Sequence, residues 1–407
     1  MHISLLLVLP FLCHAQTTSP VQNSTQASSL AALSQFLATS GETAFVNATE
    51  RVIGTTVGNQ FVSEIENAAT GNGSFTFFVP NNNAFTGSPP KNITDLNTLA
   101  GIFTYHLIEG KFTTDNIASS PGYTLVRTFM NTSQLVQLEG NKSQVLALTN
   151  DNGTIKIIGQ NTPVQVVSTI SLPSNATNPN LKAYVLSAVL DPPPTLSDAL
   201  FSTNLSAFET AARQTSYIDS LESAHGITIF APSNQAATQF FANNSSFNIS
   251  MIAALLGNHV INGSTLYSTQ FPFNTTSASG EPLTLSTNSS GAFISSGAST
   301  AKIIQPDILT SNGVIHVIDT VLLNTAENQT AANSAFSSAS SAAATAAAAE
   351  ATQTSPVGSS GSSSGPSGSN STSGGNNKTN HAINPSISLG CAISSLLSLI
   401  ATWAIVL

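Results

Sequence analysis

The feature that most constrains this fold is a block that occurs twice: a short apolar strand, a proline and a polar turn. The two copies are Thr76-Phe77-Phe78-Val79-Pro80-Asn81-Asn82 and Thr228-Ile229-Phe230-Ala231-Pro232-Ser233-Asn234. Because proline lacks a backbone N–H, it ends each strand, and the Asn or Ser behind it can cap a helix. The copies lie about 150 residues apart, far more than one solenoid unit, so two tandem domains with separate cores are predicted.

Both halves show the same order of elements, helices first and strands afterwards. Apolar residues at helical spacing begin at Leu30 and again at Leu196, and a further helix is predicted over 96–107. Strands are predicted at 74–80, 135–138, 145–148, 155–158, 164–170 and 183–190, and in the second half at 226–231, 283–286, 292–295, 302–304 and 314–323. Segregated helices and strands are typical of an α+β domain.

The run of prolines at 192–194 stops and stiffens the chain and marks a domain boundary. We therefore expect a first domain over 29–191 and a second over 195–324. Beyond 324 the composition changes: 342–349 is all Ala except Thr345, which favours transient helix, and 355–380 is mostly Ser, Gly and Asn. Segment 325–386 is expected to be a low-complexity, O-glycosylated stalk and spacer, since its Ser/Gly part cannot bury a core.

Both ends of the chain carry apolar segments typical of export and anchoring. Residues 1–15 contain the apolar run 3–12 and finish in Cys-His-Ala, which predicts a secretory signal cleaved near Ala15; the polar segment 16–28 is expected to be disordered. Residues 387–407 are apolar to the last residue, and small residues and a polar spacer precede them, the pattern of a GPI-attachment signal. The candidate attachment residues are Ser373, Gly374, Gly375 and Asn376. A retained membrane-spanning helix is the alternative.

Charge is scarce, and glycans are the expected source of surface hydration. Only 7% of residues are charged, against a typical value of roughly 25%. Asn-x-Ser/Thr sequons are dense throughout the exported region, and attached sugar would hydrate a surface that lacks charges. The candidate N-glycosylation residues are Asn23, Asn47, Asn72, Asn92, Asn131, Asn141, Asn152, Asn175, Asn204, Asn243, Asn244, Asn248, Asn262, Asn274, Asn288, Asn328, Asn370 and Asn377.

Several classes of function are disfavoured by what the sequence lacks. Its two cysteines, Cys13 and Cys391, fall in the signal and the tail, so thiol catalysis and cysteine metal sites are not expected in the mature chain. The folded region contains no Gly-x-Ser-x-Gly elbow and no His-Glu-x-x-His pair. A net charge of −9 and the absence of a basic patch disfavour nucleic acid. We expect no enzyme and no cofactor; His106 and His259, in apolar segments, are expected to bond to backbone.

The stretch 311–323 is predicted to be the closing strand of the second domain. Asn312-Gly313 is a tight-turn signal, and the apolar run behind it is rich in β-branched residues. His316 and Asp319 interrupt this run and suggest chemistry at first. We interpret them instead as buried polar residues that fix the strand's register, and place any binding role upstream at Asp307, in a loop that the strand anchors.

These residues resemble the signature blocks of fasciclin-like domains. The matching positions are Thr76, Pro80, Thr228 and Pro232 in the first block, Tyr105, His106 and His259 between the blocks, and Asn312, Gly313, His316 and Asp319 in the second. The resemblance implies an α+β fold in which a wedge of strands is flanked by helices, and a role in adhesion rather than catalysis. It also implies adhesion residues at Tyr105-His106 and at Asp307-Ile308.

Signal, repeat, stalk and tail together resemble fungal members of the family that are anchored at the plasma membrane or cell wall. The expected function is therefore a GPI-anchored, cell-surface adhesion or wall-organising glycoprotein. Its expected partners are cell-surface or wall components, protein or glycan, together with the membrane through the anchor; nucleic acid is not among them. A structural wall component without a specific ligand and a secreted hydrolase are the alternatives.

Overall fold

The computed structural model describes residues 41–70, 73–86, 94–161, 163–170, 181–244, 246–350 and 356–357. The predicted signal, the helix beginning at Leu30, the GPI tail, its attachment candidates and most of the stalk lie outside these residues, as do the sequon asparagines Asn23, Asn72, Asn92, Asn175, Asn370 and Asn377. No helix in the described ranges is both long enough and apolar enough to cross a membrane.

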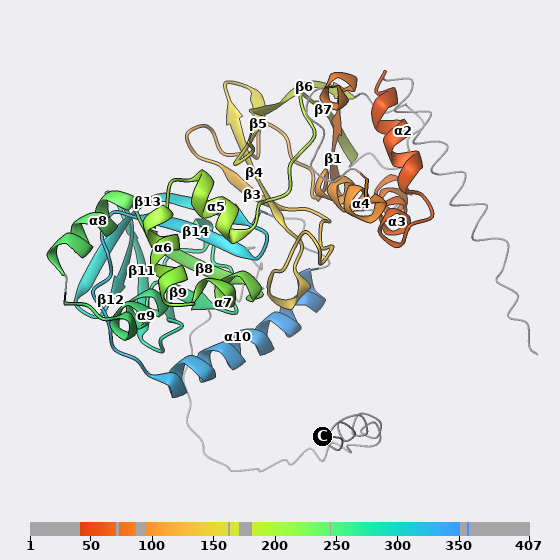
Figure 1. The fold of residues 1–407 in the computed structure, drawn as a ribbon. Coiled ribbons are helices and arrows are strands. Elements are labelled where there is room, and N and C mark those ends of the chain that lie inside the picture. Colours follow the sequence, from red (N-terminus) through yellow and green to blue (C-terminus); the bar gives the residue numbers. More distant parts are fainter. Residues whose placement is uncertain are drawn as a thin grey trace, which may run out of the picture. The chain divides into compact units, whose positions relative to one another are not determined.

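The first domain is a seven-stranded sheet with helices against one face (Figure 1). Its helices are α2 (Thr43–Val52), α3 (Thr56–Thr70) and α4 (Leu96–Tyr105), with 3-10 turns η1 (Asn82–Phe85) and η2 (Glu139–Asn141). Its strands are β1 (Phe75–Pro80), β2 (Leu107–Glu109), β3 (Thr124–Arg127), β4 (Val145–Asp151), β5 (Thr154–Ile158), β6 (Val164–Ile170) and β7 (Leu181–Leu186). They lie in the order β2-β1-β7-β6-β5-β4-β3.

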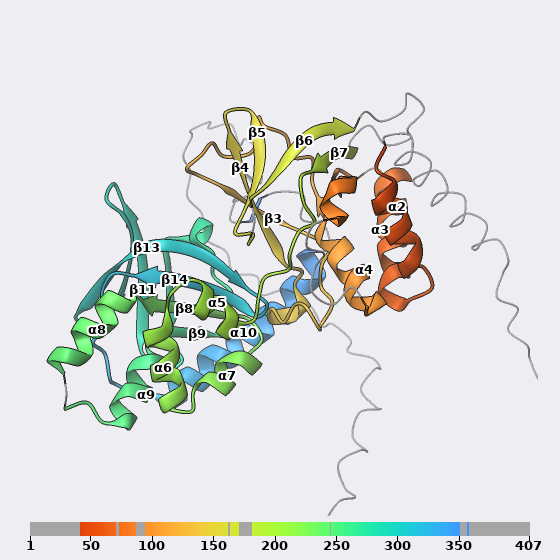
Figure 2. The same ribbon diagram turned by 45° about the horizontal axis from the view of Figure 1, so that its top comes forward.

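The second domain repeats this plan with its own sheet (Figure 2). Its helices are α5 (Leu196–Ser202), α6 (Ser206–Gln214), α7 (Ile218–Ser223), α8 (Asn234–Asn243) and α9 (Ile249–Gly257), with the 3-10 turn η3 (Ser268–Gln270). Its strands are β8 (Ile227–Pro232), β9 (Val260–Asn262), β10 (Phe273–Thr276), β11 (Pro282–Asn288), β12 (Gly291–Ser296), β13 (Ser299–Thr310) and β14 (Gly313–Ile318). The order β9-β8-β14-β13-β12-β11-β10 matches that of the first sheet strand for strand.

In each sheet the strand of the repeated block lies parallel to the closing strand: β1 beside β7, and β8 beside β14. Residues of β1 alternate between two cores, with Phe77 and Val79 on the helix side and Phe78 on the opposite side. In β8, Ile229 and Phe230 divide in the same way. Because both faces are covered, the block is apolar at every position between its Thr and its Pro. The predicted α+β fold of two tandem domains flanked by helices is confirmed.

Three local predictions are wrong. The run 135–138 forms a turn rather than a strand, although Val136 and Leu138 are buried. Asp307 and Ile308 lie inside β13, at a bulge where the pairing with β14 shifts register, rather than in a loop. Asp319 lies just beyond the end of β14 and is exposed, so it is not a buried polar group. The apolar residues Val136 and Leu138 are buried in the first domain's own core without joining the sheet, which explains the first difference. A bulge adds a residue without ending the strand, which explains the second.

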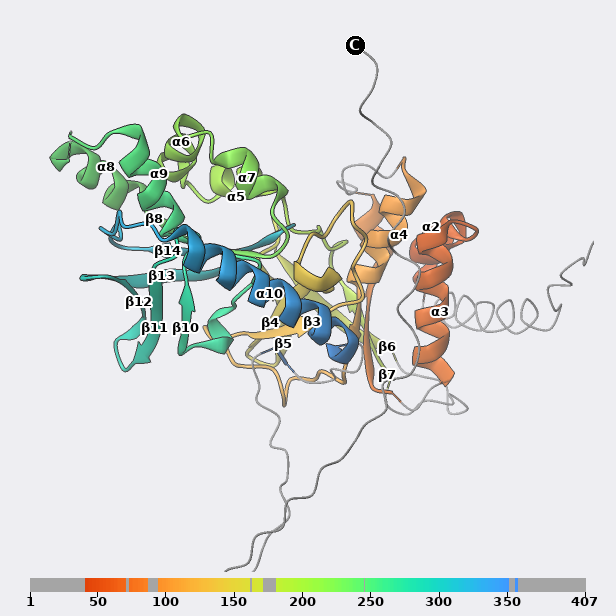
Figure 3. The same ribbon diagram turned by 90° about the horizontal axis from the view of Figure 1, so that it is seen from below.

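The Ala-rich segment is not part of a stalk, which corrects the expectation for 325–350. Residues Gln329–Glu350 form one continuous helix, α10, that lies along the second domain and ends near η2 (Figure 3). Ala332 and Ala343 are buried on its inner face. Gly280 has φ +87°, and a Cβ there would lie 1.9 Å from the carbonyl oxygen of Asn328, so only glycine lets the helix start this close.

Candidate functional site

His106 ties the end of α4 to the segment after β7. Its Nδ1 donates to the carbonyl of Ile102 at 2.8 Å, since a carbonyl can only accept. Its Nε2 accepts the N–H of Leu190 at 3.0 Å. One nitrogen donates and the other accepts, so the ring is neutral. Burial away from water lowers the pKa of His106 from 6.5 to about 4, because the charged form would lose its solvation.

His259 makes the same two bonds in the second domain. Its Nδ1 donates to the carbonyl of Leu255 at 2.7 Å, and its Nε2 accepts the N–H of Leu322 at 3.0 Å. Burial lowers its pKa to about 4 as well. The prediction that His106 and His259 bond to backbone is confirmed. Neither ring keeps a free nitrogen for a metal or a substrate.

The residue before each histidine is also buried. The Tyr105 hydroxyl donates to the carbonyl of Val145 at 3.0 Å, and the Tyr105 side chain is 1% exposed. Asn258 takes the equivalent place in the second domain and donates to the carbonyls of Asn324 and Ala326 at 3.0 and 2.9 Å. The Tyr105-His106 pair therefore holds the sheet to its helix, and a folded first domain does not offer it to a partner.

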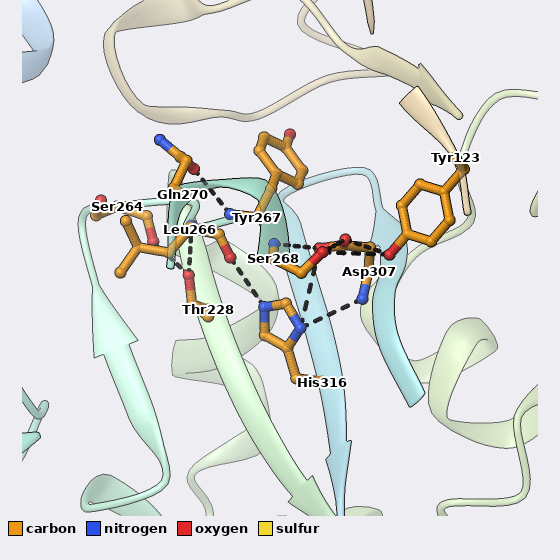
Figure 4. Close-up of polar contacts among 9 residues, drawn as sticks. All are labelled: Tyr123, Thr228, Ser264, Leu266, Tyr267, Ser268, Gln270, Asp307 and His316. Carbon is orange, nitrogen blue, oxygen red and sulfur yellow. Dashed lines mark hydrogen bonds and ion pairs between the residues drawn. The ribbon is translucent and has the colours of Figure 1, made fainter. Parts of the chain in front are cut away.

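Asp307 and His316 meet at the centre of a cluster of polar contacts in the second domain (Figure 4). The backbone N–H of Asp307 donates to Nδ1 of His316 at 3.2 Å, and Nε2 of His316 donates to the carbonyl of Leu266 at 2.8 Å. The ring of Phe230 stacks on the imidazole with centroids 5.3 Å apart. Asp307 itself has φ +58°, a left-handed conformation that Asp tolerates better than most residues.

The carboxylate of Asp307 is saturated by neutral donors. Its Oδ1 accepts the Ser268 N–H at 2.9 Å, and its Oδ2 accepts both the Ser268 hydroxyl and the Tyr123 hydroxyl. The side chain is 2% exposed. Because Nδ1 of His316 already accepts a backbone N–H, the 3.9 Å approach of Oδ1 to that nitrogen is a contact with a neutral ring rather than an ion pair. Burial lowers the pKa of His316, with the nearby Asp307 carboxylate opposing this shift.

This cluster has the composition of a Ser-His-Asp triad but not its connections. In a triad the histidine accepts the serine proton and the carboxylate orients the other ring nitrogen. Here Ser268 donates to Asp307 directly, and both nitrogens of His316 are occupied by backbone groups. The cluster can fix chain positions, but it contains no free base to activate the serine. Within the described residues, no three His, Cys, Asp or Glu side chains come together as a metal site.

Tyr123 belongs to the first domain, so its 2.5 Å hydrogen bond to Asp307 crosses between the domains. Burial raises the pKa of the Tyr123 hydroxyl, and the Asp307 charge adds to the effect. Other bonds follow the same junction: Gln144 donates to the Thr310 carbonyl at 3.0 Å, and the Gln137 N–H donates to the Ser311 carbonyl at 2.7 Å. Asp307-Ile308 therefore lies at a junction between domains.

Glu139 of η2 extends this junction. Its Oε2 accepts the hydroxyl of Thr265 in the second domain at 2.7 Å, and its Oε1 accepts Lys142 at 3.1 Å. Leu125 and Val145 of the first domain share an apolar cluster with Tyr267 and Val314 of the second. The backbone of the turn at 135–138 is bonded to the second domain through Gln137, whereas Val136 and Leu138 are buried in the first domain's own core.

The remaining motif residues fix turns. The hydroxyls of Thr76 and Thr228 donate to carbonyls beyond β2 and β9. Pro80 and Pro232 are the last residues of β1 and β8. The side chain of Asn312 donates to three carbonyls at the C-terminal end of α7, those of Leu221, Glu222 and Ala224.

Two further motif residues lie at the two ends of β14. A Cβ on Gly313 would lie 2.1 Å from the carbonyl oxygen of Ile227, so β8 and β14 could not pair there with any other residue. Asp319 accepts the N–H of Lys302 at 2.9 Å from its exposed position.

The sequon asparagines that the structure describes lie on the surface, with Asn244 only half-buried. The exposed ones are Asn47, Asn131, Asn141, Asn152, Asn204, Asn243, Asn248, Asn262, Asn274, Asn288 and Asn328. Their positions are compatible with attached sugar.

Sequence reasoning missed Tyr123, Ser268, Gln144 and Glu139. Each is a single polar residue that bonds to a segment far away in the chain, so no local spacing marks it. The Tyr123-Asp307 pair spans 184 positions.

Comparison with known proteins identifies the family. The family model described as "Fasciclin domain" matches residues 43–192 and 203–324, more than half of the chain. A fasciclin-like arabinogalactan protein of the fungus Arthroderma benhamiae is 26% identical over 257 residues, 60% of this chain and 55% of the relative, so the alignment spans about half of that protein's length. A solved FAS1 domain pair from the insect cell adhesion molecule Fasciclin I is 17% identical, with a TM-score of 0.32, over 69% of this chain and 97% of that one. The chain belongs to the fasciclin domain family, of which it carries two copies in tandem.

Proposed function

We propose that this protein is a cell-surface or cell-wall glycoprotein of the adhesion type, which presents its two fasciclin domains outside the cell on a GPI anchor. The observation that carries the proposal is the fasciclin domain pair itself, matched over most of the folded chain. Similarity to a fungal fasciclin-like arabinogalactan protein supports a place at the cell surface or wall.

The arrangement of polar groups favours binding over catalysis. The His-Asp-Ser cluster of the second domain is satisfied internally, and the two remaining buried histidines bond to backbone. Hydrogen bonds across the junction join the domains, so a partner would meet a surface drawn from both. Few charges and many exposed sequons suit a hydrated, sugar-covered surface.

Burial limits which of the candidate adhesion residues a partner could contact. The side chains of Tyr105, His106 and Asp307 are buried. Ile308 is partly buried and packs against the helix-side core of the second domain. Ile304, on the same strand, is 52% exposed. We place the contact on this outer part of β13, with Asp307 acting as the residue that holds the bulge, since bulges re-aim neighbouring side chains.

A binding assay tests this role. The secreted protein, labelled, is added to cell-wall glycan fractions and to intact cells, and Ile304→Ser is compared with Ile249→Ser, a matched exposed isoleucine on α9. We expect Ile304→Ser to weaken binding and Ile249→Ser to leave it unchanged, with equal melting temperatures. If no fraction binds the unmodified protein, it is a wall component without a specific ligand.

Anchoring is tested separately by treating intact cells with a phosphatidylinositol-specific phospholipase. Release of the protein into the medium is expected. A protein that remains in the membrane fraction after treatment would show a retained membrane-spanning helix and contradict the anchor.

A further inference from the structure

A cavity of about 350 Å³ opens where η2, α7, the end of β9 and α10 come together. This volume lies at the lower end of the range for small-ligand sites, which is about 300–1,000 Å³. Two of its lining residues decide what it can hold. Asn262 is a sequon asparagine, and Phe336 is the aromatic residue of α10.

The lining is rich in hydroxyl groups. Ser220, Ser223, Ser340 and His225 line the cavity and are exposed. The carboxylate of Glu139 also borders it but is already bonded to Thr265 and Lys142. The Ser223 hydroxyl already donates to the carbonyl of Asp219 and can only accept from a ligand. Hydroxyl and imidazole groups recognise neutral polar ligands such as sugars, which offer many donors and acceptors.

Phe336 supplies a flat apolar surface beside the sequon. It lies on the same face of α10 as the buried Ala332 and Ala343, yet its ring is 46% exposed. A Cβ on Gly263, the residue after Asn262, would lie 3.0 Å from this ring. An exposed aromatic ring on an otherwise Ser- and Ala-rich helix is the surface on which the C–H face of a sugar packs.

Asn262 is placed to deliver such a sugar. Its side chain is exposed at the cavity. The side-chain amide takes part in none of the hydrogen bonds of the described residues. The first sugar of an N-linked glycan is attached to that amide nitrogen, so it begins at the cavity wall. Asn288, by contrast, is an exposed sequon asparagine at the end of β11 and does not line this cavity.

We propose that Asn262 carries an N-linked glycan whose first N-acetylglucosamine residues dock in this cavity, stacked on Phe336 and hydrogen-bonded to the serine hydroxyls. The sugar then joins α10 to the second domain and to η2. The protein thus uses one of its glycans as an internal packing element, whereas the glycan at Asn288 remains free in solvent.

The test is the rate at which a peptide N-glycosidase releases each glycan from the folded, secreted protein, followed by mass spectrometry of the Asn262 and Asn288 peptides. We expect release at Asn262 to be slower by at least about tenfold, equivalent to about 1.4 kcal/mol of docking free energy. After denaturation the two rates should be equal. Phe336→Ala should remove the difference while leaving both sequons intact.

Three results would overturn the proposal: an unmodified Asn262, equal release rates in the folded protein, or protection that survives in Phe336→Ala. If Phe336→Ala detaches α10, seen as new proteolytic cleavage within 329–350, Phe336→Leu decides instead. This variant keeps most of the apolar volume but loses the flat ring, so it should still accelerate release at Asn262. Unchanged protection in Phe336→Leu would count against docking on the ring.

Discussion

The two domains place different residues at the same point of their sheets. In the first, the hydroxyl of Tyr184 on β7 donates to the carbonyl of Phe112 at 3.0 Å. In the second, Nε2 of His316 on β14 donates to the carbonyl of Leu266 at 2.8 Å. Both residues hold the same register against the strand of the repeated block. What the fold requires there is a hydrogen-bond donor, and either side chain supplies it.

The histidine adds one capability that the tyrosine lacks. Its second nitrogen accepts the backbone N–H of Asp307, which holds the bulge in β13 and aims the Asp307 carboxylate at Tyr123 in the first domain. A tyrosine carries its donor and its acceptor on one oxygen, whereas the histidine bonds the two backbone groups through two separate ring nitrogens. The second domain therefore uses the shared position to build the junction, while the first uses it for its own sheet alone.

The largest effect is expected at the buried histidine that both domains share, His106 in the first and His259 in the second. Replacing His106 or His259 with Ala removes a buried ring and leaves a carbonyl and an N–H without partners, so each variant should lose about 4 kcal/mol of stability. The losses should be alike, because the two rings make matching bonds. Chemical denaturation measures the loss of unfolding free energy in each variant. Hydrogen exchange at the Leu190 and Leu322 backbone amides shows in which domain the loss occurs. A loss below about 1 kcal/mol in either domain would break the equivalence.

Acid should weaken both domains through the same histidines. Their pKa values are about 4 in the folded protein and return to 6.5 on unfolding. Between these values the unfolded chain binds more protons, so stability is complete above pH 6.5 and falls as the pH drops toward 4. Each shift corresponds to a loss of roughly 3 kcal/mol at its limit. As the pH falls through this range, the denaturation midpoint should decrease less steeply in His259→Phe than in the unmodified protein. If the two slopes are equal, groups other than His259 cause the acid sensitivity.

Substitutions at the position where the domains differ, Tyr184 in the first and His316 in the second, should cause unequal losses of stability. His316→Phe removes a donor and an acceptor and frees the Asp307 N–H, for a loss of about 3 kcal/mol, whereas Tyr184→Phe removes one donor, for about 1 kcal/mol. Urea denaturation of the two variants compares them. Equal losses would mean that the bond to Asp307 contributes nothing.

Asp319→Ala should have the smallest effect. Asp319 is exposed and accepts a single N–H, from Lys302, so we expect a loss of about 0.5 kcal/mol. A change in thermal melting large enough to unfold the second domain alone would contradict the surface position. The prediction from sequence that Asp319 is a buried register residue assigned it too large a role.

The sequence predicted many elements of each domain because their signals are local, but it did not predict the short strands β2, β3, β9 and β10. An apolar run followed by a proline indicates strands such as β1 and β8, and apolar periodicity indicates helix α4. The equivalence of Tyr184 with His316 was missed because a phenol and an imidazole look unrelated until the register aligns them. The docking of α10 was missed because alanines carry no pattern, and only the glycines beneath them admit the helix.

The polar cluster could be predicted only in part. His316 and Asp307 were singled out from the sequence, but their contact depends on a bulge, and a bulge leaves no clear mark in the residues around it. Tyr123 and Ser268 reach Asp307 from distant segments, one of them in the other domain. Such contacts follow from the packing of whole domains rather than from local preference.

The most direct test of this account is the protonation of the imidazoles, read from long-range ¹H–¹⁵N correlations of the histidine side chains. We expect His106 and His259 as neutral rings protonated at Nδ1 and His316 as a neutral ring protonated at Nε2, all unchanged between about pH 7.5 and 5.5. An imidazolium at His316 that titrates near its ordinary pKa would show a free nitrogen beside Asp307. That result would contradict the claim that the cluster is a structural tie between the two domains.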